Sequence, residues 1–501
     1  MMKFSHQPDK PRADAQYVSR FIDQDFLLSC DAAVELYEIH ARDLPIVDYH
    51  CHLSPEAIAR DHRFANMTEL WLAGDHYKWR AMRTAGVDER FCTGDATDRE
   101  KFQKWAETVS KTLRNPLYHW THMELARPFG IRDRVLNDET AESIWNECNA
   151  RLAEPEFSCP GLMRQFDVRV VCTTDDPADD LAAHLAIAAD KDFKIQVLPT
   201  WRPDKVLALD QLAVPKIFNE YIDRLGVCAG IEISTYDQLL EALAKRHAFF
   251  AECGCRLSDH GLENIDVEPY TLVDVRAAFS RLRSGHELTA SEAALYRSAL
   301  LYELARMDHA AGWAQQFHLG ALRNQNLRAL KTLGADAGFD SIGPALDVRA
   351  IARFLGRLDA DGVLAKTILY NLNPADNEMI ATMIGNFQDG KTPGKIQYGS
   401  AWWFLDQLDG MKRQIDALSN MGLLSQFVGM VTDSRSFVSY VRHDYFRRLL
   451  CDILGREMEA GLIPRDIELV GGMVRDICYH NARRYFGFDV KGPLDNTSAI
   501  Q

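Results

Sequence analysis

The sequence lacks the features that would assign it to several large classes of protein. No uninterrupted apolar run is long enough to span a membrane, and the polar N-terminal stretch has no apolar core of a signal peptide. No run rich in lysine and arginine is present, and the net charge is −15, so the basic surface that phosphate backbones require is missing. We therefore expect a cytoplasmic protein that binds neither membranes nor nucleic acids.

No CxxC pair is present either. The 11 cysteines are odd in number and scattered along the chain, so reduced thiols in a packed interior are the expected state. No internal repeat, low-complexity tract or flexible linker interrupts the chain. With 501 residues, of which 47% are hydrophobic, the chain can bury a large core, and we expect a single domain over residues 1–501.

Short apolar runs that end in polar residues recur along the chain, and helix-like sequence separates most of them. Between the first and second runs, from about residue 55 to 165, no strand pattern is visible, which predicts a helical insertion. Eight strands alternating with helices are typical of an α/β protein with a TIM-type (β/α)8 barrel, whose chemistry lies at the carboxyl ends of the strands. The first predicted strand ends near residue 50, and the others lie at 168–177, 193–203, 255–261, 313–320, 366–374, 395–404 and 424–435.

Two histidines, His50 and His52, follow the first apolar strand. Residues two apart in a strand point to the same face, so both imidazoles could bind one divalent ion. A chain with 16 histidines contains a His-x-His pair by chance about half the time. The argument for a metal site therefore depends on the position of this pair at a strand end.

Asp433 and Arg435 lie at the end of the eighth predicted strand. In a closed barrel this strand is next to the first, so Asp433 could complete a His, His, Asp metal site with one position open for water or substrate. The alternative for Asp433 is to cap the following helix. Arg435 is either a surface ion-pair residue or a ligand for a substrate oxygen in the same pocket.

Eight segments in the same order, spread over about residues 30–490, resemble those of the uronate (glucuronate) isomerase family of the amidohydrolase superfamily. They read DYHCHLSPEAIARD, GDHYKWRAMR, LYHWTHMELARPFGI, VVCTTDDPADDL, PTWRPDK, QFHLGALRN, YGSAWWF and VTDSRSF. The resemblance implies a distorted (β/α)8 barrel with a helical insertion and a homo-oligomeric assembly. It also implies interconversion of D-glucuronate with D-fructuronate, and of D-galacturonate with D-tagaturonate, in hexuronate catabolism.

The fourth and sixth predicted strands favour an isomerase over a hydrolase. Binuclear hydrolases of this superfamily bridge their metals with a Lys or Glu on strand four and add a His from strand six. Here these strands read CRLSDHG and TILYNLNP, so a second ion would lack ligands. We expect one divalent metal, with zinc as the first choice, and leave open whether the reaction requires it. A mononuclear metal-dependent amidohydrolase is the alternative, and a binding protein without turnover is a further one.

An aldose–ketose exchange through a cis-enediol needs a base, an acid and stabilisation of charge on the enediolate. Asp433 is the predicted base or proton shuttle, Tyr77 its partner in the second transfer, and Arg435 the cation beside them. The roles of Asp433 and Tyr77 could be reversed, and hydride transfer is the competing route.

The remaining predicted residues bind the sugar acid. A carboxylate and hydroxyls call for planar cationic donors, and an apolar sugar face calls for an aromatic ring. His76 and His318 are the expected hydrogen-bond donors to the substrate. His318 is placed with the substrate in preference to the metal, and the spacing leaves open whether Asp259 supports the site. The predicted substrate-binding residues are His76, Arg202, His318, Trp402 and Arg435.

Overall fold

Parallel strands form the centre of the molecule. The structure, a computed structural model, describes residues 21–209 and 214–490. One sheet has the order β1 (Ile46–Asp48), β2 (Val168–Cys172), β3 (Gln196–Leu198). The second has the order β4 (Leu257–Leu262), β5 (Ala314–Leu319), β8 (Lys366–Asn371), β9 (Ile396–Tyr398). Parallel bridges from Trp201 to Asp175 and to Ser258 join the two sheets. The strands of the joined sheets therefore lie side by side in the order in which they occur in the sequence.

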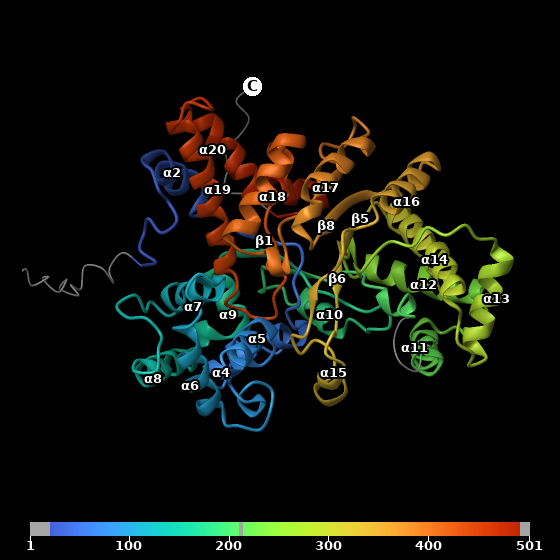
Figure 1. Ribbon diagram of the computed structural model, residues 1–501, viewed down its shortest axis with the longest axis horizontal. Helices are drawn as coiled ribbons and strands as arrows, with labels where there is room; N and C mark the ends of the chain where they lie inside the picture. Colours follow the sequence, from blue (N-terminus) through green and yellow to red (C-terminus); the bar gives the residue numbers. More distant parts are fainter. Residues whose placement is uncertain (1–20, 210–213, 491–501) are drawn as a thin grey trace, which may run out of the picture.

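Helices follow the strands and cover them on the outside (Figure 1). Many begin with a side chain that caps the free backbone amides, as Thr289 and Glu292 do in a reciprocal capping box at the start of α14. No helix in the described ranges is long and apolar enough to cross a bilayer. The main covering helices are α10 (Ala182–Ala189), α11 (Val214–Ala229), α12 (Tyr236–Glu252), α13 (Leu272–Arg283), α14 (Ala290–Ala311), α16 (Val348–Ala360), α17 (Asn377–Met383) and α18 (Leu408–Met421).

Only helices and loops lie between β1 and β2, a part of the chain that is described throughout. Figure 1 shows most of these helices together in the blue and cyan part of the molecule. Aromatic side chains make some of the contacts between these helices, and the Trp71 and Phe102 rings stack 6.0 Å apart. The helices are α3 (Pro55–Ala59), α4 (Met67–Leu72), α5 (His76–Thr84), α6 (Asp98–Val109), α7 (Pro116–Ala126), α8 (Ala141–Leu152) and α9 (Cys159–Gln165).

The eighth predicted strand, at 424–435, does not form as a ladder strand in the described structure. Leu424–Gln426 is a short 3-10 turn, and 427–435 is irregular. Gly429 (φ +83°) and Asp433 (φ +45°) have left-handed backbone conformations that interrupt an extended chain. The prediction of a strand here was wrong, because hydrophobic patterning does not report such backbone conformations.

This segment nevertheless lies beside β1, as the barrel requires. Asp433 N donates to His50 O over 3.2 Å, and His52 N donates to Ser434 O over 2.9 Å. Side chains replace the missing ladder bonds: the buried Asp48 carboxylate accepts from Thr432 N (2.9 Å) and from the Thr432 hydroxyl (2.6 Å). The last barrel segment is therefore held to β1 by side-chain hydrogen bonds as well as by its backbone.

Two parts of the chain contain helices and strands that were not predicted. A short antiparallel pair, β6 (Ala321–Leu322) with β7 (Ser341–Ile342), encloses α15 (Leu327–Leu333). At the other end of the chain α19 (Val441–Glu459) packs against α2 (Asp31–Leu36), as Figure 1 shows, followed by α20 (Ile467–Arg475) and α21 (Asn481–Phe486). The chain is thus an α/β barrel-like fold with helical additions.

Candidate active site

A cavity of about 1050 Å³ lies at the carboxyl ends of the strands. It contains residues from β1, β3–β4 loops, β5, the β9 loop and the segment after Val431, which lie far apart in the sequence. Eight of the nine residues that the sequence predicts for the site line this cavity. They are His50, His52, His76, Arg202, His318, Trp402, Asp433 and Arg435.

Asp433 lies between the two histidines of the first strand end. Its Oδ1 is 3.1 Å from Nε2 of His50 and 3.1 Å from Nε2 of His52. Burial alone would raise the pKa of Asp433, but the bonds to both histidines outweigh this effect and hold its pKa well below the usual range. Burial lowers the pKa of His52 to about 4. At neutral pH the site therefore contains an ionised carboxylate next to a neutral imidazole.

These three residues fit a divalent metal ion. One ligand atom from each of His50, His52 and Asp433 lies within 4.8 Å of the others. Two imidazole nitrogens and a carboxylate oxygen are the donor set of many catalytic zinc sites, which keep one position open. A second group, formed by His50, Asp259 and His318, meets the same distance limit. The described part of the chain therefore has a candidate metal site that is built around His50.

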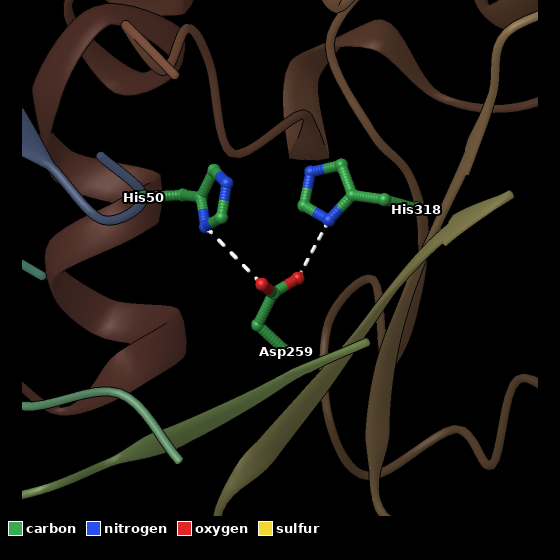
Figure 2. Close-up of side chains that lie close together, drawn as sticks. All are labelled: His50, Asp259 and His318. Atoms are coloured by element: carbon green, nitrogen blue, oxygen red, sulfur yellow. Dashed lines mark hydrogen bonds and ion pairs between the residues drawn. The ribbon is translucent and has the colours of Figure 1, made fainter. Parts of the chain in front are cut away.

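Asp259 on β4 is the site residue whose role the sequence left undecided. Figure 2 shows His50 and His318 on either side of its carboxylate. Oδ1 of Asp259 is 2.6 Å from Nδ1 of His318, and Oδ2 is 3.9 Å from Nδ1 of His50 and 2.9 Å from Nη1 of Arg202. Burial would raise the pKa of Asp259, but Arg202 and the two histidines hold it well below its usual range. This buried carboxylate joins three of the predicted site residues.

The bond to Asp259 also determines what His318 offers to the cavity. Burial lowers the pKa of His318, so the ring is neutral, and its Nδ1 proton belongs in the bond to the ionised Asp259. Nε2 then carries the lone pair. Among the described residues this buried Nε2 has no hydrogen-bond partner, so it can accept a hydrogen bond or bind a metal.

The two arginines differ in their surroundings. Arg202 is held by Asp259 and by Asp204, whose Oδ2 is 3.1 Å from Nε. A Cβ at Gly261 would lie 2.3 Å from Nη2 of Arg202, so any other residue there would displace the guanidinium from its present position. The side chain of Arg435 is 38% exposed, and its Nη2 lies 3.5 Å from Asp336. Arg202 is therefore fixed in the wall, whereas Arg435 reaches solvent.

Tyr77 is the predicted residue that does not line the cavity as the structure describes it. It is half-buried on α5, with its ring stacked on that of His76 at 4.8 Å. Its other neighbours are Trp120, in edge contact at 6.2 Å, and the guanidinium of Arg442, 5.5 Å from the ring centre. Burial raises the pKa of Tyr77 well above its usual range, although Arg442 lowers it, so the phenol keeps its proton at neutral pH.

Aromatic residues and the β6–β7 hairpin form the rest of the wall. Trp402 donates from Nε1 to the Asn371 carbonyl (3.2 Å) and meets the His318 ring edge to face at 4.7 Å. The hairpin contributes Arg323, whose guanidinium lies 4.9 Å from the Trp403 ring centre. Arg323 and Trp403 were not predicted. The visible signals were the RN that ends QFHLGALRN and the second Trp of AWWF.

A family model described as glucuronate isomerase matches residues 18–486. The chain belongs to the glucuronate isomerase family. The family that the eight motifs indicate is thus confirmed, and the chain is an isomerase. The alternative of a mononuclear amidohydrolase is not favoured.

Individual relatives agree with the glucuronate isomerase family. The uronate isomerase of Cellvibrio japonicus is 58% identical over 470 residues, which cover 94% of this chain and 99% of that protein. That of Phocaeicola vulgatus is 56% identical over 473 residues, covering 94% of this chain and all of the relative. The chain therefore spans the full length of its relatives.

Solved structures of the family share the fold. The uronate isomerase of Thermotoga maritima superposes with a TM-score of 0.87 at 35% identity, covering 93% of this chain and 99% of that one. The glucuronate isomerase of Caulobacter crescentus gives 0.85 at 27% identity, covering 93% and 97%. The expected α/β barrel-like fold is confirmed.

Proposed function

We propose that this isomerase interconverts D-glucuronate with D-fructuronate, and D-galacturonate with D-tagaturonate. The observation that carries the proposal is an ionised carboxylate, Asp433, held between His50 and His52 in a cavity that also contains the guanidinium groups of Arg202 and Arg435. A base beside cations suits a substrate with an acidic C–H group and a carboxylate of its own. We also propose that the described helices between β1 and β2 are an insertion in a single domain.

In the proposed reaction, Asp433 removes the proton from carbon 2 of the aldose and a cis-enediol forms. Its pKa, held well below the usual range, keeps this carboxylate ionised and therefore unprotonated at neutral pH, the form that a general base requires. Tyr77, whose raised pKa keeps its phenol protonated and whose ring stacks on that of the lining residue His76, is the proposed partner for the transfer to carbon 1. Arg435 stabilises the negative charge that develops on the enediolate oxygens. A hydride shift between the two carbons is the competing route.

The sugar acid itself would be held by the remaining wall residues. Arg202 and Arg435 are donors for the carboxylate and hydroxyls. His76 can donate a hydrogen bond, and His318 accepts one at Nε2, which differs from the donor role that the sequence predicts for it. The Trp402 ring covers an apolar face of the sugar.

We infer that His50, His52 and Asp433 hold one divalent ion, with zinc as the expected metal. Such an ion would polarise the carbonyl and hydroxyl oxygens of a substrate. The cytoplasm is the proposed compartment because all 11 cysteines lie in the described ranges and are free. A homo-oligomer stays a prediction from the family resemblance.

The test of this function is proton NMR of the purified protein with D-glucuronate in heavy water. We expect fructuronate with deuterium incorporated at the exchanged carbon. Ketose without deuterium would favour a shielded proton transfer or a hydride shift. If neither glucuronate nor galacturonate changes while metal is supplied, the proposed function is wrong.

Substitutions then test the roles in the same assay. Asp433→Asn and Tyr77→Phe should each lower kcat by about 10²–10⁴, the usual contribution of a general base or acid. Asp416→Asn, which alters a surface ion pair with Lys412 on α18, is the control and should leave kcat unchanged. Full activity of Asp433→Asn would remove the proposed base.

A further inference from the structure

Arg442, near the start of α19, is a buried cation outside the cavity lining. Its residue exposure is 3%. Nη1 donates to the Thr432 carbonyl over 2.9 Å and to Oδ2 of Asp406 over 3.1 Å. One guanidinium nitrogen therefore joins the backbone next to Asp433 to a buried carboxylate.

The plane of the same guanidinium lies among aromatic rings. Its carbon is 4.1 Å from the Trp120 ring centre and 5.5 Å from that of Tyr77. Trp120 and Tyr77 belong to α7 and α5, in the helices between β1 and β2. Arg442 thus contacts both the segment that carries Asp433 and the helix that carries Tyr77, which are about 350 residues apart in sequence.

The backbone that Arg442 holds is an unusual one. Asp433 has φ +45°, a conformation that is unfavourable for a non-glycine residue and persists where neighbouring contacts fix it. On the N–H side of Thr432 the fixing contact is the Asp48 carboxylate, at 2.9 Å. On the C=O side it is Arg442. The peptide units on both sides of Thr432, the residue before Asp433, are therefore held.

We propose that Arg442 is a positioning residue for the isomerase reaction, because it fixes the Thr432–Asp433 backbone relative to the ring of Tyr77. The proposal rests on the function proposed above, in which these two side chains exchange protons with the substrate. Transfer between two carbons needs both groups in place at once, and a misplacement of about 1 Å costs roughly 10²-fold in rate. Arg442 touches neither substrate nor metal and acts through its two neighbours.

The experiment compares Arg442→Lys and Arg442→Gln with a matched control, Arg447→Lys. Arg447 is on the same helix, is buried, and donates to two backbone carbonyls, those of Leu44 (2.7 Å) and Pro45 (2.8 Å), at the opposite end of β1. All variants are assayed with D-glucuronate below their thermal midpoints. We expect kcat of both Arg442 variants to fall about 10- to 100-fold with KM changed less than about threefold.

Arg447→Lys should lower the thermal midpoint to a similar extent but keep kcat within about twofold of the wild type. If the Arg442 variants keep the kcat of Arg447→Lys while the wild type is active, the positioning role is wrong and the proposed function stands. A wild type that converts neither uronate overturns both. A loss confined to KM also contradicts the proposal, since it would indicate a substrate-binding role.

Asp406→Asn keeps the test decisive if the Arg442 variants do not fold. This substitution leaves Arg442 in place and removes the charge of one of its two anchors. We expect a kcat loss smaller than that of Arg442→Lys, with KM unchanged. An unchanged kcat in a folded Asp406→Asn protein would overturn the proposal.

Discussion

At the scale of single residues, Asp259 contacts three of the predicted site residues, and no motif in the sequence indicates these contacts. Its carboxylate is fully buried and meets Arg202, His318 and His50. Removing one partner of a buried ion pair leaves the other charge without compensation, which is more costly than replacing both.

We therefore expect Asp259→Asn to lower the free energy of unfolding by about 3–5 kcal/mol and to lower kcat by about tenfold or more. Urea unfolding and the NMR assay measure the two effects. Asp308→Asn is the control: Asp308 is equally buried and is bonded to His247 (3.1 Å) and Ser258 (2.6 Å), but it does not line the cavity. A variant of Asp259 with wild-type kcat would show that the orientation of His318 is not needed.

The sequence predicted that His50, His52 and Asp433 would lie close together. His50 and His52 follow β1, and Asp433 is in the irregular segment that lies beside β1, so the three meet at one edge of the barrel. The partners of Asp259 were not predictable, since they depend on which side chains reach across from neighbouring strands. The absence of Tyr77 from the cavity lining was not predictable either, because the position of its ring depends on how α5 packs against α7.

At the scale of elements, the eighth barrel segment depends on Asp48 and Thr432 in place of a regular ladder. Thr432→Val keeps the shape of the side chain but removes the 2.6 Å bond to the buried carboxylate. The free energy of unfolding should fall by about 1–2 kcal/mol, and kcat should fall because Asp433 is the next residue. Chemical denaturation and turnover measure these effects. Thr84→Val, an exposed position on α5, should change neither.

A buried carboxylate on α19 gives stability that depends on pH. Asp444 on α19 accepts from the Tyr37 hydroxyl at 2.5 Å and lies 3.1 Å from Arg127 and 3.2 Å from Arg448. Burial would raise the pKa of Asp444, but Arg448 and Arg127 outweigh it and lower the pKa. The ionised carboxylate therefore stabilises the fold above the ordinary pKa of about 4, and this contribution is lost as the pH falls through the folded pKa.

Asp444→Asn should accordingly be less stable than the wild type by about 2–3 kcal/mol at pH 7, with the difference shrinking as the solution is acidified below about pH 4. Urea unfolding at a series of pH values measures it. Asp476→Asn, which alters the exposed pair with Arg484, is the control. A difference that stays constant down to pH 2 would contradict the charge argument.

The sequence predicted seven of the barrel strands near their observed places, because each is a buried apolar run with polar residues after it. It predicted the eighth as a strand on the same pattern, but Gly429 and Asp433 bend the chain and side chains replace the ladder. The hairpin of β6 and β7 has strands of two residues each. Such strands are too short for periodicity to detect.

At the scale of the whole molecule, the proposed metal would couple the site to overall stability. An ion that binds the folded chain at 100 times its Kd adds about 2.7 kcal/mol to the free energy of unfolding. We expect a chelator to lower the thermal midpoint of the metal-loaded protein, and zinc to restore it. In His52→Ala the chelator should have no effect. An equal effect in both proteins would place the ion elsewhere.

The overall charge of −15 is opposed by local arginines where an anionic sugar is proposed to bind. Arg202 and Arg435 were predicted to bind the sugar acid, and both line the cavity together with Arg323. Composition alone could not predict which arginines would line it, since 57 lysines and arginines are distributed over the chain. The order of the motifs identified the family, and patterning alone identified only the type of barrel.

The pairing of β1 with the last barrel segment has a consequence for synthesis of the chain. Asp48 and Thr432 are 384 residues apart. At the usual speeds of translation, a ribosome needs roughly 20–80 s to make that length. During this time one edge of β1 has no partner, and exposed strand edges promote aggregation. The edge of β1 in the nascent chain is therefore open to wrong pairing until the C-terminal segment has been made.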